Sequence, residues 1–379
     1  MHVTTRIAAS VLPLIAFALT TAPLAAQDSH GLNLTVHHAG ISIGDSRGVN
    51  GLRLNFRDRR LQWVNGANIT IWQPHHDPTG DVRGLALGLP LTGAGTITGL
   101  AVGIGGVDAD ERITGLGIGG LGLGAGDRLV GVMIGGLGAG SGNDVLGAAI
   151  GGLGVGAGND VHGVLIGGLG AGAGNELRGI AIAGLGVGAG NDVKGITLAG
   201  IGIGSGNSLS GLAIAGVGIG SGNDLRGVAI AGVAVGSGGN LTGIAAAPIA
   251  VGAGGDMTGL AIGGVGVGAG GTLTGVGIGG LGIGASSVRG VMIAGVAAGG
   301  EDVAGLVVAP AYFRIGDHRG RFTGVSASAF NDIKGEQHGL TIGLFNYARR
   351  LFGVQIGVLN YAKNNPFPFK LLPLVNVHM

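Results

Sequence analysis

Carboxylates recur at one fixed place in the middle of this chain. Asp144, Asp160, Asp192 and Asp224 each follow a Gly-Asn pair, at steps of 16 or 32 residues. Carboxylate and carbonyl oxygens are the ligands that calcium prefers, so turns from consecutive repeats are candidates to share an ion. The equivalent place in other repeats holds Glu176, Ser208, Asn240 or Thr272. The four aspartates therefore form a candidate calcium corner without a uniform set of donors.

The residue just before each of these positions is more constant than the aspartate itself, and it is asparagine. The same place in six consecutive repeats holds Asn143, Asn159, Asn175, Asn191, Asn207 and Asn223. Stacked side-chain amides can bond to their neighbours above and below. We predict that these residues form a structural amide ladder beside a solvated, charged corner.

Other chemistry is not indicated. The chain contains no cysteine, which excludes disulfides and zinc thiolate sites. Its glycine-rich runs lack the following helix that a phosphate loop needs, and no nucleophile elbow is present. We interpret the segment Asp108-Ala-Asp-Glu-Arg112 as a solvated loop rather than a catalytic carboxylate pair. The prediction is a protein that is not an enzyme, with no cofactor and no catalytic residues.

The element that carries these residues is a repeat of about 16 residues. Glycines start successive units at 84, 99, 115, 131, 147, 163, 179, 195, 211, 227, 243, 259, 275, 290, 305, 324, 339 and 353. A fixed period of this kind indicates one architecture repeated along an axis. Looser copies precede it, with Val-Asn-Gly at 49–51 and again at 64–66. We therefore expect the array to begin before its glycine-rich part.

One unit predicts two short strands joined by a bend. Its apolar residues occupy places two, four, seven, nine and fifteen, as in Leu212, Ile214, Val217, Ile219 and Leu225. Alternation favours strands, and the change of parity requires a bend at Ala215-Gly216. We predict that these five residues point inward and that the glycines at places eight, ten and twelve line the outside.

The predicted fold is an all-β repeat solenoid of about 16 residues per coil, with aromatic-rich terminal caps. Helices are disfavoured because each unit carries several glycines, which cost about 1 kcal/mol apiece in a helix interior. A β-barrel stays open as the alternative, although the array lacks the aromatic girdles of membrane barrels.

Composition divides the chain into four regions. Residues 1–26 read as a signal peptide, with Arg6, an apolar stretch and a small-residue exit before Gln27. Residues 27–83 form an N-terminal capping segment with divergent repeats, 84–304 the glycine-rich array, and 305–379 the C-terminal repeats and cap. Without Arg6, 20 basic side chains balance 20 acidic ones, so no nucleic-acid partner is indicated.

Two resemblances follow from the motifs. The turns at 140–147, 156–163 and 220–227 look like the calcium turns of the RTX β-roll, although that repeat is about nine residues long. The C-terminal runs Gly339-Leu-Thr-Ile-Gly-Leu-Phe-Asn346 and Gly353-Val-Gln-Ile-Gly-Val-Leu-Asn360 resemble a bacterial exported surface-repeat family, over about residues 324–379. That resemblance implies export and surface association, with no assigned chemistry.

These observations predict an exported repeat protein of the cell envelope or surface, with a structural or adhesion-like interaction role. An outer-membrane β-barrel protein and a calcium-binding β-roll are the alternatives. We expect the protein at the cell surface, at the outer membrane or outside the cell. We expect its partners to be a second copy, through the glycine-lined faces, or another envelope surface.

Overall fold

The computed structural model describes residues 30–74 and 79–379. The predicted signal peptide lies outside the described residues. The chain divides into two compact units, residues 1–141 and 142–379. Within the described residues no helix is long and apolar enough to cross a membrane.

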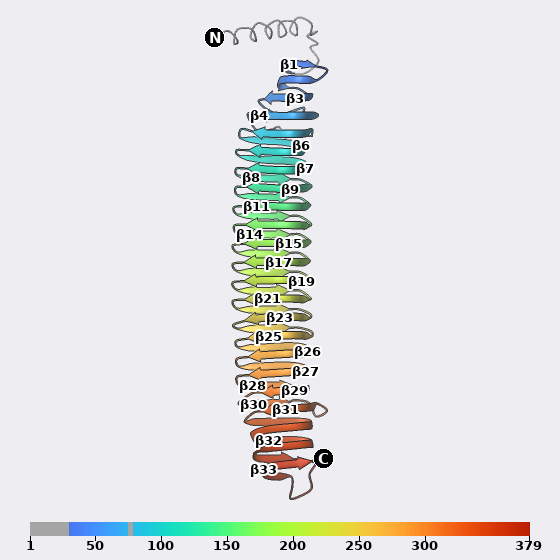
Figure 1. Ribbon diagram of the computed structural model, residues 1–379, viewed down its shortest axis with the longest axis vertical. Coiled ribbons are helices and arrows are strands. Elements are labelled where there is room, and N and C mark those ends of the chain that lie inside the picture. Colours follow the sequence, from blue (N-terminus) through green and yellow to red (C-terminus); the bar gives the residue numbers. More distant parts are fainter. Residues whose placement is uncertain (1–29, 75–78) are drawn as a thin grey trace, which may run out of the picture. The chain divides into compact units, whose positions relative to one another are not determined.

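Unit 1 is built from short strands (Figure 1). They are β1 His30–Val36, β2 Ala39–Asp45, β3 Gly48–Asn55, β4 Trp63–Thr70, β5 Asp81–Gly88, β6 Leu91–Gly103, β7 Gly106–Gly119, β8 Gly122–Ala125, β9 Arg128–Gly135 and β10 Gly138–Ser141. From β2 onward the strands pair in parallel with the equivalent strand of the next coil, as in β4 on β5. The first strand, β1, pairs antiparallel with β2.

Unit 2 continues the same plan in its own coils. Its strands are β11 Asp144–Gly151, β12 Gly154–Ala157, β13 Val161–Gly167, β14 Gly170–Ala173, β15 Glu176–Ala183, β16 Gly186–Ala189, β17 Asp192–Ala199, β18 Gly202–Ser205, β19 Leu209–Ala215, β20 Gly218–Ser221, β21 Leu225–Ala231, β22 Ala234–Ser237, β23 Leu241–Ala247, β24 Ala250–Ala253, β25 Met257–Gly263, β26 Gly266–Gly279, β27 Gly282–Ala294, β28 Ala297–Gly300, β29 Asp302–Val308, β30 Tyr312–Ile315, β31 Arg321–Ala327, β32 Phe330–Ala362 and β33 Leu371–His378. The last strand, β33, pairs antiparallel with β32.

The predicted β-solenoid is confirmed, and so is its register. In unit 2 a longer strand and a shorter strand alternate, and each pairs with its equivalent 16 residues on, as Leu209 with Leu225 and Ile203 with Ile219. From β11 to β25 the longer strands stack in parallel as one layer and the shorter strands as another, and the long strands β26, β27 and β32 contribute to both layers. The bend falls at Gly216 and Val217, between β19 and β20, one residue beyond the predicted Ala215-Gly216 step.

The first glycine of each coil sets this register. In unit 2 these glycines have φ between 114° and 153°, a conformation that side chains with a Cβ rarely adopt. From Gly163 onward, a Cβ added at this place would lie 1.8–2.2 Å from the carbonyl oxygen of the first glycine one coil earlier. Gly51 and Gly66 share the conformation in unit 1, which confirms that the repeats begin before residue 84.

The predicted inner face was wrong at three of its five places. Ile219 and Leu225 are buried as expected, but Leu212 is only half-buried, and Ile214 and Val217 are 39% and 44% exposed. Ala213 and Ala215 are buried in their stead. Successive side chains of an extended strand point to opposite faces, so burial of Leu225 directs places three and five inward and places two and four outward.

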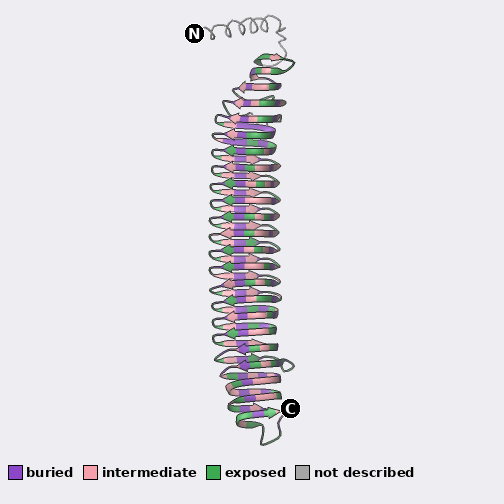
Figure 2. Cartoon of the chain, in the orientation of Figure 1, coloured by how far each residue is buried: buried purple, intermediate pink, exposed green. Residues whose placement is uncertain are grey.

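The core is consequently thin. Its layers consist of Leu, Val or Met at place fifteen, mostly Val or Ile at place nine, and mostly Ala or Ser at places three, five and eleven. Figure 2 shows the buried residues as bands that recur at the same position in successive strands. Small residues leave room for the two layers of strands to approach closely, and the aliphatic side chains at places two, four and seven remain partly or largely exposed.

Candidate functional site

The corner predicted from Asn and Asp lies at the turn between the short strand and the next long strand of unit 2. Its backbone bonds directly from coil to coil: the amide of Asn159 donates to the carbonyl of Asn143 at 2.8 Å. The same bond continues from Asn175, Asn191, Asn207 and Asn223 to the asparagine of the preceding coil, at 2.8–2.9 Å. The six predicted ladder residues are therefore aligned along one edge.

Their side chains form a mixed ladder rather than a purely amide one. Amides bond to amides at two steps, from Asn191 to Asn175 at 2.6 Å and from Asn223 to Asn207 at 2.7 Å. At the other three steps the amide donates to a carboxylate of the preceding coil. These bonds join Asn159 to Asp144 at 3.2 Å, Asn175 to Asp160 at 2.7 Å and Asn207 to Asp192 at 2.9 Å.

The aspartates of the candidate calcium corner also accept bonds from the backbone of the following coil. Asp160 accepts from the amide of Glu176 at 3.1 Å, and Asp224 from the amide of Asn240 at 3.3 Å. Asp192 accepts from both the amide and the hydroxyl of Ser208, at 3.2 and 2.7 Å. These carboxylates thus cap N–H groups that face the turn.

Hydrogen bonding sets the charge state of this corner. Bonds from the Ser208 hydroxyl and from Lys194 hold the pKa of the Asp192 carboxyl well below its usual value. Lys194 contacts both Asp192 and Glu176, at 2.9 and 3.1 Å. Among the residues that the structure describes, no group of three or more His, Cys, Asp or Glu is placed to hold a metal ion. Calcium binding remains a prediction, which a melting curve with added calcium would check.

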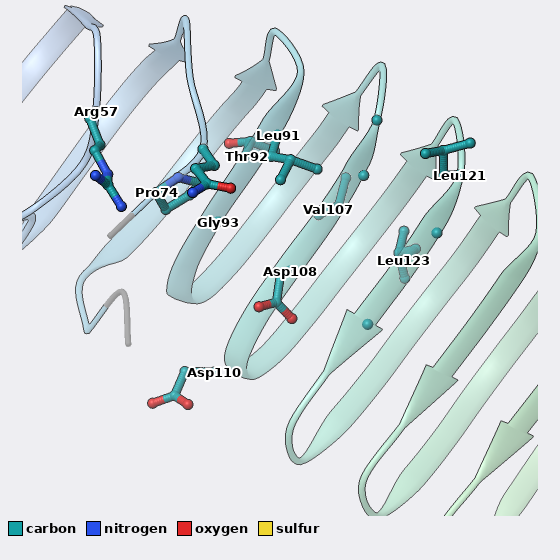
Figure 3. A pocket seen from close by; sticks show the side chains of 15 residues that line it. Arg57, Pro74, Leu91, Thr92, Gly93, Val107, Asp108, Asp110, Leu121 and Leu123 are labelled. Carbon is teal, nitrogen blue, oxygen red and sulfur yellow. The ribbon is translucent and has the colours of Figure 1, made fainter. Parts of the chain in front are cut away.

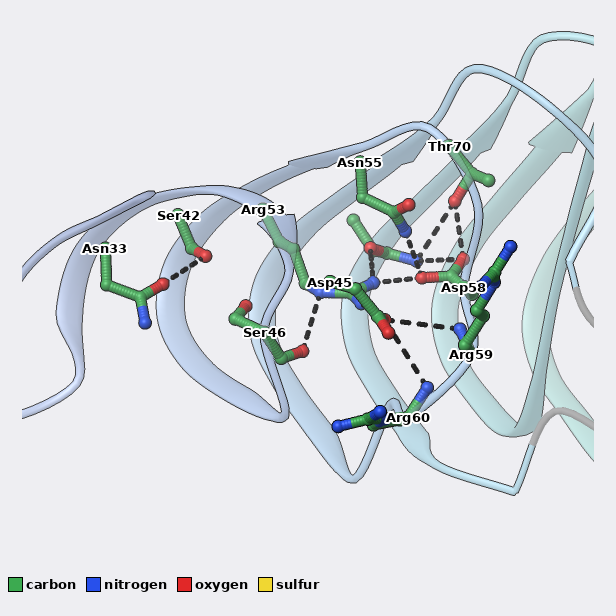
Figure 4. A network of polar contacts seen from close by, with 11 residues as sticks. Asn33, Ser42, Asp45, Ser46, Arg53, Asn55, Asp58, Arg59, Arg60 and Thr70 are labelled. Carbon is green, nitrogen blue, oxygen red and sulfur yellow. Dashed lines mark hydrogen bonds and ion pairs between the residues drawn. The ribbon is translucent and has the colours of Figure 1, made fainter. Parts of the chain in front are cut away.

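A buried polar network in unit 1 was not anticipated from the sequence (Figure 4). The Arg53 side chain is fully buried and pairs with Asp58 and, at 3.1 Å, with Asp45. It also donates to Asn68 at 2.9 Å, and Thr70 donates to Asp58 at 2.6 Å. The network could have been found from the register of the repeats. Arg53 and Asn68 each stand two residues after the first glycine of their coil, Gly51 and Gly66, and most later coils bury alanine at that place.

A shallow recess of about 680 Å³ lies on the outer side of unit 1 (Figure 3). Arg57, Thr92, Asp108 and Asp110 are among its lining residues. Partial burial of the Asp108 carboxyl group in the recess, together with the charge of Asp110, raises its pKa. The segment around Asp108 is part of strand β7 and not the predicted loop, because its backbone pairs with both β6 and β8.

The C-terminal coils carry a buried amide stack of their own. Asn331 donates to Asn346, and Asn346 to Asn360, both at 2.7 Å, and all three side chains are fully buried. Asn346 and Asn360 are the asparagines of the surface-repeat motif. The motif's Gln355 is also fully buried and donates to Gln337 at 3.0 Å. The polar residues of the motif therefore form a hydrogen-bonded core.

Aromatic side chains cover the outer side of these C-terminal coils. The Tyr312 ring lies 5.7 Å from Phe330, and Phe330 lies 4.9 Å from Phe345. The Tyr312 hydroxyl donates to Asp332 at 2.9 Å, and burial together with that carboxylate raises the pKa of the tyrosine. The aromatic rows begin where the glycine-rich short strands end.

The outer side of the short strands in unit 2 is nearly bare, as predicted. Glycine predominates at places eight and ten, and the added Cβ would meet no atom within 4 Å at Gly204, Gly220, Gly236, Gly268 and Gly284. Alanine occupies place eight at Ala234 and Ala250 without disturbing the register. These glycines are therefore not required by the fold of the chain itself. We call this surface the glycine face.

Comparisons with known protein families, curated proteins and solved structures found no match for this chain.

Proposed function

We propose that this protein is an exported, non-catalytic structural or interaction protein of the bacterial cell envelope. The observation that carries the proposal is the repetition of one polar corner in successive coils of unit 2. Five consecutive coils, from Asn159 to Asn223, present an asparagine next to a carboxylate or hydroxyl, and each asparagine is bonded to the coil before it. The predicted signal peptide and the C-terminal motif resemblance support export.

The mechanism we propose is display of many equivalent weak sites. Exposed pairs such as Asp224 and Arg226, 2.7 Å apart, contribute little individually because water competes for them. Equivalent sites at a regular spacing can engage a partner together, so that the total affinity far exceeds that of one site. The partner is then an envelope component whose own polar groups repeat.

The test is to express the full chain with its own leader in a bacterial host and to fractionate the cells. We expect a processed chain that begins near Gln27, is recovered with the envelope or outside the cell, and is cleaved by protease added to intact cells. Recovery of the unprocessed chain in the cytosol would refute the proposal.

Variants of the corner test the mechanism separately from export. Replacing Asp192 and Asp224 by serine, and Lys194 and Arg226 by threonine, copies residues that other coils already carry at those places, as Ser208 and Thr242 do. We expect retention on the envelope to fall as more coils are changed, with unchanged export. A matched control changes Gly204 and Gly236 on the glycine face to alanine. Equal retention in both sets would contradict the display mechanism.

A further inference from the structure

Unit 2 exposes a continuous aliphatic face on the outer side of its long strands. We define it as the residues at places two and four between 147 and 308. Those that are 37–43% exposed are Ile150, Ile166, Ile180, Ile182, Ile196, Ile214, Ile230, Ile244, Ile262, Ile293 and Leu306. These places were predicted to lie in the core, so their exposure has no role in the predicted fold.

The side chains of this face stand in two rows that follow the strand register. Ile166 pairs with Ile182, and Ile214 with Ile230, at place four. Ile180 pairs with Ile196 at place two. Each row therefore repeats at the spacing of neighbouring strands, about 4.8 Å. A second surface stays in contact over many coils only if its own side chains repeat at that spacing.

The exposed area is that of a stable interface. With an average of about 60 Å² left exposed per residue, the two residues in each of the eleven coils from Gly147 to Val308 amount to roughly 1,300 Å². The largest apolar patch on a typical soluble monomer is about 300–600 Å². A standard protein interface buries about 800 Å² on each partner, so this face alone exceeds that requirement.

One border of the face matches the anatomy of a protein interface, whereas the other is a row of exposed aliphatic residues at place seven, such as Leu185, Ile201 and Val217. Place sixteen, on the same outer side of the long strands, holds polar residues such as Arg178, Lys194, Arg226 and Thr242. An apolar centre beside a polar rim is the usual arrangement at interfaces between proteins. Two of its cations are already paired within the chain: Arg178 contacts Glu176 at 2.8 Å, and Arg226 contacts Asp224 at 2.7 Å.

From this register, area and border we infer that the aliphatic face of unit 2 packs against the same face of a second copy of this chain. Two such sheets would pack face to face at about 10 Å, with the aliphatic rows interdigitated. A lipid surface fits less well. Residues 147–308, all described by the structure, contain no Phe, Trp or Tyr, which interfacial segments use as anchors, and no unpaired cluster of cations faces anionic headgroups.

The experiment measures the solution mass of the protein by sedimentation equilibrium. The full chain is expressed with its own leader and purified without detergent from whichever cell fraction contains it. The test variant carries Ile182→Lys, Ile214→Lys and Ile262→Lys. The control carries Gly204→Lys, Gly236→Lys and Gly268→Lys, which adds the same charges to the glycine face, where the added side chain has room. Circular dichroism verifies that both retain β-structure.

We expect the wild-type protein and the glycine-face control to have twice the chain mass, and the isoleucine variant to dissociate with a Kd raised at least ~100-fold. If the lysine variant unfolds, Ile→Thr at the same three positions keeps the β-branched side chains and should still weaken the dimer. A monomeric wild-type protein, or an isoleucine variant with unchanged mass, would overturn the inference.

Two further outcomes separate this inference from its rivals. A wild-type monomer that sediments with vesicles of phosphatidylethanolamine and phosphatidylglycerol would assign the face to lipid and refute the dimer. Dissociation of the glycine-face variant alone would move the interface to the opposite sheet. Neither outcome depends on where the cell places the protein, so failure here is distinguishable from failure of the proposed function.

Discussion

Gly211 and Gly220 belong to the same coil, yet alanine should have opposite effects at the two positions. Gly211 opens the coil with a φ of 114°, and an added Cβ would lie 2.1 Å from the carbonyl oxygen of Gly195. Gly220 lies on the glycine face, where an added Cβ meets nothing within 4 Å. The same methyl group is therefore added once against the backbone and once into solvent.

The expected magnitudes follow from these two environments. A left-handed backbone costs a residue with a Cβ about 1–2 kcal/mol, and relieving the contact with Gly195 adds about 1–3 kcal/mol. Gly211→Ala should therefore destabilise its coil by about 3 kcal/mol. Gly220→Ala should stabilise it by about 0.4–1 kcal/mol, because alanine restricts the unfolded chain. The difference approaches 4 kcal/mol, which is nearly a thousandfold in the opening equilibrium.

Hydrogen exchange of the full chain is the appropriate assay, because a repeat array opens locally and each coil contacts only its neighbours. The amides of β19 and β21 report on the coil that contains both glycines. We expect faster exchange there for Gly211→Ala and equal or slower exchange for Gly220→Ala, with distant coils unchanged. Equal exchange in the two variants would refute the assignment of the first glycine as the determinant of register.

Three further predictions concern charge and polar burial. Hydrogen bonding lowers the folded-state pKa of Asp192. The ionised Asp192 should therefore stabilise the protein above its ordinary pKa near 3.8, and this stabilisation should be lost as the pH falls toward the lower folded-state pKa. Asp192→Asn should flatten that part of the acid-denaturation profile. Arg53→Ala should destabilise unit 1 by about 3–5 kcal/mol because it leaves the buried Asp58 carboxylate without its countercharge. Arg226→Ala, which removes an exposed ion pair, should cost under about 1 kcal/mol in urea titrations. Asn346→Ala should cost about 1–3 kcal/mol of stability because it removes hydrogen-bond partners from buried Asn331 and Asn360. Asn191→Ala at the exposed corner should cost about 0.5–1.5 kcal/mol in the same urea titrations. Similar losses in the two variants would contradict the difference between the buried and the exposed asparagines.

The candidate corner could be located from the sequence but not fully described. Equal spacing was enough to align Asn143 with the five later asparagines, because a coil of constant length stacks equivalent residues. The choice between an amide and a carboxylate as acceptor depends on which side chain of the preceding coil lies nearer. Asn175 therefore bonds to Asp160, whereas Asn191 bonds to Asn175.

Sequence alone determined the coil length and the register of this protein. The glycines from Gly84 to Gly353 that mark the repeats all adopt positive φ, and this local requirement can be read without knowing the neighbours. Tertiary structure decided which residues lie inside. Burial of Leu225 sets the parity of its strand, and the small volume between the two sheets admits Ala213 while Ile214 stays outside. The same parity directs Arg53 inward, whereas Asn346, seven residues after Gly339, lies inward beyond the bend of its coil. At both places hydrogen-bond partners from neighbouring coils make burial of a polar group stable.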